Sequence, residues 1–226
     1  MNILNRKKLD KLFVNILEGN ANKMENDKLE LGDVYFYNIF DLDEEYIERL
    51  RYWRNQDFVR ENMFNQHIIS EDEHNEFISK LKDNKLKRFY ICFMGIKPFG
   101  VLYYEYLSNS NNLEFGYYLI DKNYINSGLG IVMEYAILNH AFYKLNVDKV
   151  YCRTFVKNNK VVSLHNNFGF LTEKIVKYYI KDNESYLDVA VQAIDKRNWE
   201  NNKKSIEKYI KVLLGGNIVN EIESGV

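Results

Sequence analysis

The sequence predicts an α/β protein in which a mixed, twisted sheet of about seven strands is flanked by helices. Short apolar or aromatic runs bounded by turn residues alternate with longer segments whose apolar residues recur at helical spacing. One of the strands, at residues 113–120, leads into a glycine loop that opens a helix. With 226 residues the chain can bury one substantial core. We therefore expect one folded domain over residues 31–195, an N-terminal helical extension over 1–30 and a C-terminal helical tail over 196–226.

The N-terminal half is expected to form one strand and two helices. A strand over 34–39 follows a turn near Gly32. Asp43 has the position of an N-cap, with acidic residues in the first turn of the helix that follows. Ser70 and Glu73 have the spacing of a capping box and predict the start of the second helix.

The C-terminal half is expected to alternate strands and helices. Strands are predicted at 89–94, 99–107, 113–120, 149–155, 172–181 and 186–193, and helices at 131–142, 160–167 and 199–214. Counted with the first strand, this order gives a mixed sheet whose helices cover both faces.

The glycine loop predicts an anion-binding site. It comprises six consecutive residues, Asn126, Ser127, Gly128, Leu129, Gly130 and Ile131. Glycines let the backbone approach a ligand closely, and the N–H groups and dipole of a helix N-terminus attract negative charge. The loop lacks the Gly-Lys-Ser/Thr of a P-loop, and it lacks the third glycine and downstream acidic residue of a dinucleotide fold. The pyrophosphate of coenzyme A is the expected anion.

Two motifs resemble the GNAT superfamily of acetyl-CoA-dependent N-acetyltransferases over about residues 33–193. The segment 125–130 matches the family's Gln/Arg-x-x-Gly-x-Gly/Ala loop except at Ile125. Asn158, Leu164, Gly169 and Phe170 match the family's later Asn…Leu-Tyr…Gly-Phe pattern. The resemblance implies a GNAT fold, an acyltransferase that uses acetyl-CoA without a metal, and a pantetheine arm bonded near Leu119 and Ile120.

The same resemblance implies roles for several polar residues. Asn158 would contact pantetheine or order its loop, although it could equally be a helix N-cap. His165 stands where the family usually has the tyrosine that protonates the coenzyme A thiolate; a surface histidine without a catalytic role is the alternative. Glu114 is the candidate base. Glu105 competes for that role and is also placed in the acceptor site.

The acceptor is predicted from the N-terminal half. Trp53-Arg54-Asn55, a later acidic and methionine-containing segment, and Glu114-Phe115-Gly116 resemble the sugar-nucleotide N-acetyltransferases of pseudaminic acid biosynthesis. That resemblance implies transfer to the 4-amino group of a nucleotide-linked amino-dideoxy sugar, with Arg54 in the acceptor cleft. The structural alternatives are core packing for Trp53 and an ion pair with Glu45 or Glu61 for Arg54. Ribosomal-protein N-terminal acetyltransferases are the second candidate, and a non-catalytic acetyl-CoA-binding protein is the third.

Composition excludes some other classes. A formal net charge of −1 and a pI near 6.5 give no electrostatic basis for nucleic-acid binding. Cys92 and Cys152 lie in apolar runs without metal-ligand spacing and predict two reduced core thiols. No apolar run approaches the length of a membrane span and no signal-peptide pattern is seen, so we expect a cytoplasmic protein. The N-terminal helix and the long tail are candidate elements of a homodimer.

Overall fold

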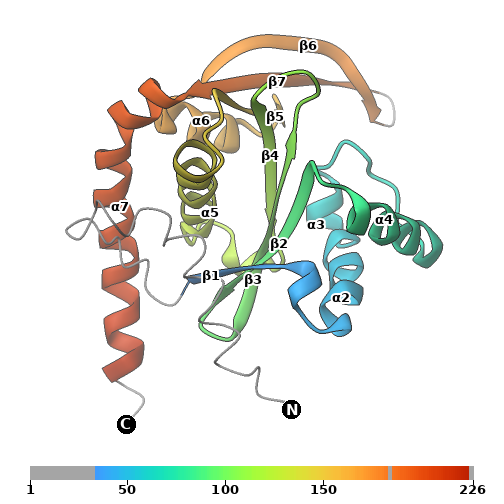
Figure 1. The fold of residues 1–226 in the computed structure, drawn as a ribbon, viewed down its shortest axis with the longest axis horizontal. Coiled ribbons are helices and arrows are strands. Elements are labelled where there is room, and N and C mark those ends of the chain that lie inside the picture. The colour runs from blue at the N-terminus through green and yellow to red at the C-terminus, as the bar shows by residue number, and fades with distance from the viewer. Residues whose placement is uncertain (1–33, 183–184, 224–226) are drawn as a thin grey trace.

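The computed structural model describes residues 34–182 and 185–223. The predicted N-terminal helix therefore lies outside the described residues. Figure 1 shows the fold, whose elements follow in this order: β1 (Val34–Asn38), η2 (Ile39–Asp41), α2 (Glu44–Arg54), α3 (Asp57–Arg60), α4 (Glu71–Asp83), β2 (Lys87–Met94), β3 (Lys97–Tyr106), β4 (Asn112–Leu119), η3 (Lys122–Tyr124), α5 (Leu129–Asn139), η4 (His140–Lys144), β5 (Lys149–Phe155), α6 (Asn159–Phe168), β6 (Leu171–Asp182), β7 (Ser185–Asp195) and α7 (Lys196–Glu223).

The seven strands form one mixed sheet in the order β1-β2-β3-β4-β5-β7-β6. Every neighbouring pair is antiparallel except β4 and β5, which are parallel. β3 and β4 stay in register from Tyr106 opposite Leu113 to Gly100 opposite Leu119. The β4–β5 ladder stops after Glu114 pairs with Tyr151. The sheet therefore opens between β4 and β5, on the side of the strand that leads into the glycine loop.

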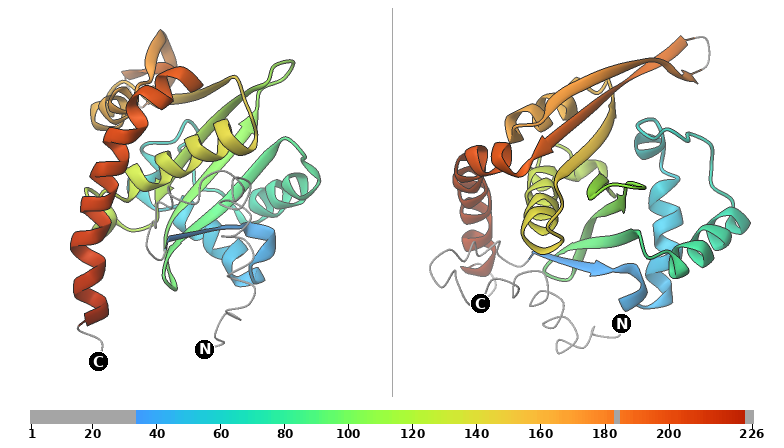
Figure 2. Two further views of the ribbon diagram at one scale, coloured as in Figure 1. Left: turned by 60° about the vertical axis from the view of Figure 1, so that its left-hand side comes forward. Right: turned by 45° about the horizontal axis from the view of Figure 1, so that its top comes forward.

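Helices cover both faces of this sheet, as the sequence predicts. α5, α6 and α7 lie on one face, and α2, α3 and α4 lie on the other (Figures 1 and 2). The core divides accordingly: one apolar cluster joins the sheet to α5 and the start of α7, and a second joins it to α2 and α4. α5 is buried on nearly all sides because it lies between the sheet and α7.

Local signals place most element ends correctly. The Ser70–Glu73 capping box is confirmed, since each partner accepts a hydrogen bond from the other's backbone N–H. Asp43 has the predicted N-cap position, but its side chain makes no capping hydrogen bond. Trp53 is 6% exposed and packs in the second core cluster, so the structural alternative for this residue is confirmed.

Two helices differ in length from the prediction. The helix after the glycine loop begins at Leu129 and passes into a π-helical turn at His140–Lys144. The tail helix begins at Lys196 and continues to Glu223, beyond the predicted end near Leu214. Its first turns are fixed to the domain by Trp199, a fully buried ring that stacks on Phe168 at 6.0 Å.

Candidate active site

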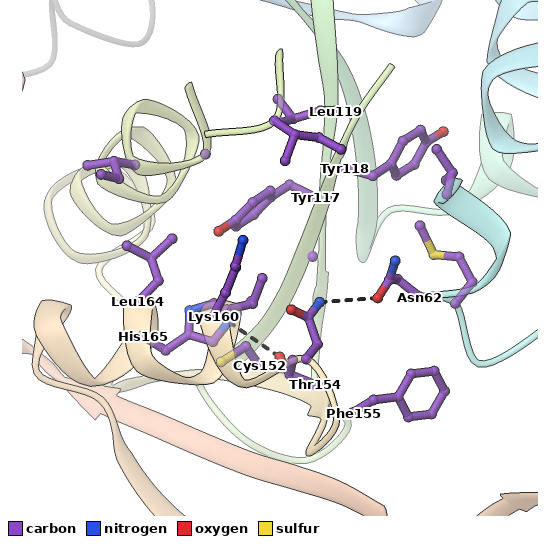
Figure 3. A pocket seen from close by; sticks show the side chains of 18 of the residues that line it. Asn62, Tyr117, Tyr118, Leu119, Cys152, Thr154, Phe155, Lys160, Leu164 and His165 are labelled. Atoms are coloured by element: carbon purple, nitrogen blue, oxygen red, sulfur yellow. Dashed lines mark hydrogen bonds between the residues drawn. The ribbon is translucent and has the colours of Figure 1, made fainter. Parts of the chain in front are cut away.

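A cavity of about 580 Å³ occupies the opening between β4 and β5. Its walls come from the glycine loop, the second half of β4, the end of β5 and the first turns of α6 (Figure 3). Phe58, Asn62, Met63 and Phe64 close one side, and Tyr209 of α7 contributes from another element. The cavity thus joins segments that are more than a hundred residues apart in the chain.

Four of the six residues of the glycine loop border this cavity. Asn126, Gly128, Gly130 and Ile131 line it, whereas Ser127 and Leu129 do not. Ser127 instead donates from its hydroxyl to the Tyr124 carbonyl at 2.6 Å and accepts from the Leu129 N–H, which fixes the turn. Leu129 is buried in the core.

The loop backbone is shaped to present N–H groups. Asn126 and Gly128 are left-handed, with φ of 66° and 84°, and Gly128 is the N-cap residue of α5. In the part of the chain that the structure describes, no group accepts from the N–H of Gly130. A Cβ at Gly130 would lie 3.4 Å from the Tyr117 ring. The helix N-terminus, the free N–H of Gly130 and the absence of side chains at Gly128 and Gly130 fit a phosphate group.

The two residues expected to bind pantetheine, Leu119 at the end of β4 and Ile120 directly after it, differ in their surroundings. The Ile120 N–H donates to the Phe99 carbonyl on the β3 side, and the Ile120 carbonyl accepts from Gln56. Because successive strand residues direct their backbone groups to opposite sides, Tyr117 and Leu119 direct theirs toward β5, beyond the end of the parallel ladder. Tyr117 and Leu119 line the cavity, whereas Ile120 does not. An added strand would therefore pair with Tyr117 and Leu119.

His165 lies in the cavity wall and is only 2% exposed, so it is not the surface histidine of the alternative interpretation. Its Nδ1 is 2.9 Å from Oε1 of Glu134, which is fully buried on α5. Its Nε2 is 3.4 Å from Oγ1 of Thr154 on β5, as Figure 3 shows. Oε2 of Glu134 accepts from the Tyr117 hydroxyl at 3.1 Å. A histidine held between a carboxylate and a hydroxyl can transfer a proton.

Asn158 and Lys160 face the cavity from the start of α6. Asn158 is at the N-cap position, but its side chain makes no capping hydrogen bond and instead donates to Oδ1 of Asn62 at 3.3 Å (Figure 3). Lys160 is exposed and points into the cavity (Figure 3). Ile125, the departure from the family's polar loop residue, also lines the cavity and is 46% exposed.

The two candidate bases are both engaged in ion pairs. Oε1 of Glu114 is 2.7 Å from the Arg153 guanidinium, and Oε2 of Glu105 is 3.1 Å from Nζ of Lys87. Glu105 and Glu114 are directly opposite each other on β3 and β4, so each cation offsets repulsion between like charges. Arg153 lines the cavity, whereas neither carboxylate does.

Arg54 organises the segment between α2 and α4. Its guanidinium donates to the Asn65 carbonyl, and it forms no ion pair with Glu45 or Glu61 among the described residues. Burial lowers the pKa of Arg54 from its usual value, but an arginine stays charged at neutral pH. The next residue, Asn55, exchanges two hydrogen bonds with the backbone of Ile69, at 2.8 and 2.9 Å. These contacts fix the loop that carries the Phe58–Phe64 side of the cavity.

Three cavity residues, Tyr117, Thr154 and Tyr209, were not predicted, and neither was Glu134, which does not line the cavity but contacts His165. These four residues come from four different elements, and only the fold brings them near His165 or the glycine loop. One signal was present for Glu134, a single carboxylate in an otherwise apolar helix segment, 129–138. An ionisable residue at such a position is buried and needs partners.

Cys92 and Cys152 are free and buried, as predicted, and burial raises the pKa of each thiol well above its ordinary value. Across residues 34–182 and 185–223 no group of three or more potential metal ligands is present. No described helix is long and apolar enough to span a membrane.

The sequence profile of the acetyltransferase (GNAT) domain matches residues 39–171, more than half of the chain. The chain therefore belongs to the GNAT family, and it is an N-acetyltransferase. It is similar to two proteins named Acetyltransferase PseH from Campylobacter jejuni subsp. jejuni. Identity is 29% for serotype O:2 and 27% for serotype O:23/36, in each case over 145 residues covering 63% of this chain and 89% of the relative.

A solved structure supports the same fold. Spermidine N-acetyltransferase from Vibrio cholerae, determined in complex with CoA and spermine, superposes with a TM-score of 0.68 at 20% identity. The match covers 75% of this chain and 99% of that one. At this identity the likeness establishes the GNAT fold, which the sequence motifs had implied.

Proposed function

We propose that the chain transfers the acetyl group of acetyl-CoA to the 4-amino group of a nucleotide-linked amino-dideoxy sugar. The observation that carries this proposal is the cavity in the β4–β5 opening. It runs from the glycine loop to an aromatic side formed by the segment between α2 and α4 together with rings from β3 and β4. One part has the donors for a phosphate and an extended arm, and the other has rings suited to a sugar or a base.

Acetyl-CoA fits this cavity in one direction. The pyrophosphate binds at Gly128 and Gly130, where the α5 N-terminus offers backbone donors, and Lys160 supplies the cation that Ile125 does not. The pantetheine arm pairs with Tyr117 and Leu119 along β4 and passes Asn158. The adenosine then extends toward Tyr209, whose ring stacks on the adenine.

The chemistry requires a polarised carbonyl and a proton for the leaving thiolate. A free β4 backbone N–H in the opening is the oxyanion donor. His165 is the proton donor, because it is the histidine in the cavity wall and is connected to Thr154 at the surface of the cavity. Glu114 remains the proposed base, acting through water, since Arg153 holds it beside the cavity without placing it in the lining.

The acceptor proposal depends on the aromatic side of the cavity. Phe58, Phe64, Tyr103 and Tyr118 line it, and burial raises the pKa of both tyrosines, which leaves neutral hydroxyls able to donate and accept. Arg153 lies over the Phe64 ring at 5.2 Å and adds a cation for an anionic substrate. The similarity to Acetyltransferase PseH and the Trp53-Arg54-Asn55 resemblance support a sugar acceptor over a peptide.

The test is mass spectrometry of purified protein incubated with acetyl-CoA. UDP-4-amino-4,6-dideoxy sugars are compared with a ribosomal-protein N-terminal peptide and with spermidine, and heat-denatured protein is the control. An increase in mass by one acetyl group on the sugar nucleotide alone supports the proposal. Acetylation of the peptide or of spermidine alone overturns the acceptor while leaving the acetyltransferase reaction in place. Binding of acetyl-CoA without transfer to any amine favours the non-catalytic alternative.

A further inference from the structure

Glu134 is a buried ionisable residue that has no role in the proposed reaction. It lies one turn after Gly130 on α5, in a segment whose other residues are apolar or aromatic, and its side chain is 0% exposed. Each carboxylate oxygen has one protein donor: Oε1 faces Nδ1 of His165 at 2.9 Å and Oε2 accepts from the Tyr117 hydroxyl at 3.1 Å. Both hydrogen bonds join α5 to elements that line the cavity.

His165 is the next member of this chain of contacts. Its ring packs against Phe115 and Phe170, with centroids 6.0 and 5.3 Å away. Since Nδ1 is engaged by Glu134, Nε2 is the nitrogen left to face Thr154, at 3.4 Å from Oγ1. Figure 3 shows the contact of His165 with Thr154, which lines the cavity. With the Glu134–His165 hydrogen bond, the contacts run from a fully buried carboxylate to the space proposed for the thioester.

We propose that Glu134 is a positioning residue that holds His165 in the tautomer and charge state needed to protonate the coenzyme A thiolate through Thr154. This inference rests on the proposed acetyl transfer. Histidine is shorter than the tyrosine usual at this position, and the Thr154 hydroxyl extends its reach to the cavity.

The proton transfer balances within the reaction. When the tetrahedral intermediate collapses, the C–S bond breaks and the thiolate takes a proton from Oγ1 of Thr154. Oγ1 takes the Nε2 proton of the imidazolium, which becomes neutral imidazole and keeps its Nδ1 proton, hydrogen-bonded to the Glu134 carboxylate. The attacking amine gives one proton through water to the proposed base, Glu114. Exchange with solvent returns that proton to His165 before the next turnover, so the net reaction consumes no external acid.

Burial explains why a carboxylate is required. An imidazolium enclosed by two phenylalanine rings is disfavoured unless an opposite charge lies beside it. Tyr117 from β4 and Cys152 from β5 are titratable groups that face Glu134. Burial raises the pKa of both well above their ordinary values, so both are neutral and Glu134 supplies the compensating charge.

The test compares E134Q, T154V and T154S with wild type. E134Q keeps the size and one acceptor oxygen but removes the charge. We expect at least a tenfold loss of kcat with a KM for acetyl-CoA within about twofold, and an alkaline fall in kcat that begins at lower pH. T154V should lose a similar factor, T154S should retain most activity, and E134Q/T154V should lose no more than about twofold beyond either single variant.

A purely structural role for Glu134 predicts different results. The proposal would be overturned if the alkaline limb of the kcat–pH profile were unchanged in E134Q. It would also be overturned if the loss of kcat in the double variant equalled the product of the two single losses. A lower melting temperature with an unchanged kcat would overturn it as well.

A second readout needs no acceptor and separates this inference from the proposed function. The chain has 4 histidines, so the His165 ring can be followed by NMR during a pH titration of the CoA-bound protein. We expect its midpoint to move to lower pH in E134Q. An identical midpoint overturns the role of Glu134, whereas absence of acetyl transfer in the wild type overturns the proposed function alone.

Discussion

Replacing Tyr209 with alanine tests the direction in which coenzyme A lies in the cavity. Tyr209 is on α7, outside residues 39–171 that match the family, yet it lines the same cavity as Ile131 and Lys160. α7 is fixed beside α5 by Ile210, which is buried, and by Glu207, which accepts from the Tyr135 hydroxyl at 2.8 Å. Tyr209 itself is 54% exposed, so part of its ring is available to a ligand.

The expected magnitude follows from base stacking. Removing an aromatic partner of a nucleobase costs about 1–3 kcal/mol. Because the Tyr209 ring is only partly exposed, one face at most can stack, and we expect the lower half of that range, about 1–2 kcal/mol. A factor of ten in Kd corresponds to about 1.4 kcal/mol. Y209A should therefore weaken CoA binding about 5- to 30-fold.

The assay is isothermal titration calorimetry with CoA and with pantetheine, which lacks the adenosine. Y209A should weaken CoA alone, Y209F should bind CoA as wild type does, and Y52A should have no effect because Tyr52 is exposed outside the cavity. Equal losses for CoA and pantetheine would mean that α7 shapes the pantetheine site instead. Unchanged CoA affinity in Y209A would refute the stacking geometry altogether.

Three further predictions concern the loop, the thiols and a helix cap. G128V forces a β-branched residue to a φ of 84°, which costs about 1–2 kcal/mol. It should weaken CoA binding about tenfold, measured by calorimetry. The control G95A, at a φ of 57° in the β2–β3 turn, should lower the stability of the fold without changing the Kd for CoA. Burial raises the pKa of Cys92 and Cys152, so a thiol reagent should modify neither in the native protein and both in denaturant. The Ser70 N–H lowers the pKa of Glu73. The contribution of the Glu73 carboxylate to stability is therefore present above the ordinary carboxyl pKa and is lost as pH falls through the lowered pKa. E73Q should flatten that part of an acid unfolding curve followed by circular dichroism, and a slope equal to that of wild type would contradict this prediction.

The fold could be predicted because its signals are local. Alternating apolar residues identified all seven strands, and the capping box fixed the start of α4 within one residue. The short helix Asp57–Arg60 was not predicted, because four residues carry too little periodicity. The start of α7 at Lys196, before the predicted start at Trp199, also lacked a local marker, because its first turns are held by long-range packing of Trp199 on Phe168.

The cavity lining could be predicted only where a motif is continuous in sequence. Asn126, Gly128 and Gly130 line the cavity, and their proposed role depends on backbone N–H groups, so a short motif is enough to indicate such a loop. Glu114 was chosen from its strand position alone. Its pairing with Arg153, 39 residues away, depends on the register of β4 with β5 and on side-chain direction, and neither can be obtained from one sequence.

The two departures from the family pattern each have a partner from another element. Ile125 removes a polar side chain from the loop, and Lys160 faces the same cavity from α6. His165 replaces the usual tyrosine, and Glu134 and Thr154 contact its two ring nitrogens. A fully buried carboxylate contributes less to folding than an apolar residue of similar volume, because its desolvation offsets much of what its partners return. A protein that only bound acetyl-CoA would gain nothing from that cost, whereas an enzyme that must protonate a thiolate in a buried site would. The Glu134–His165 pair therefore favours catalysis over binding alone.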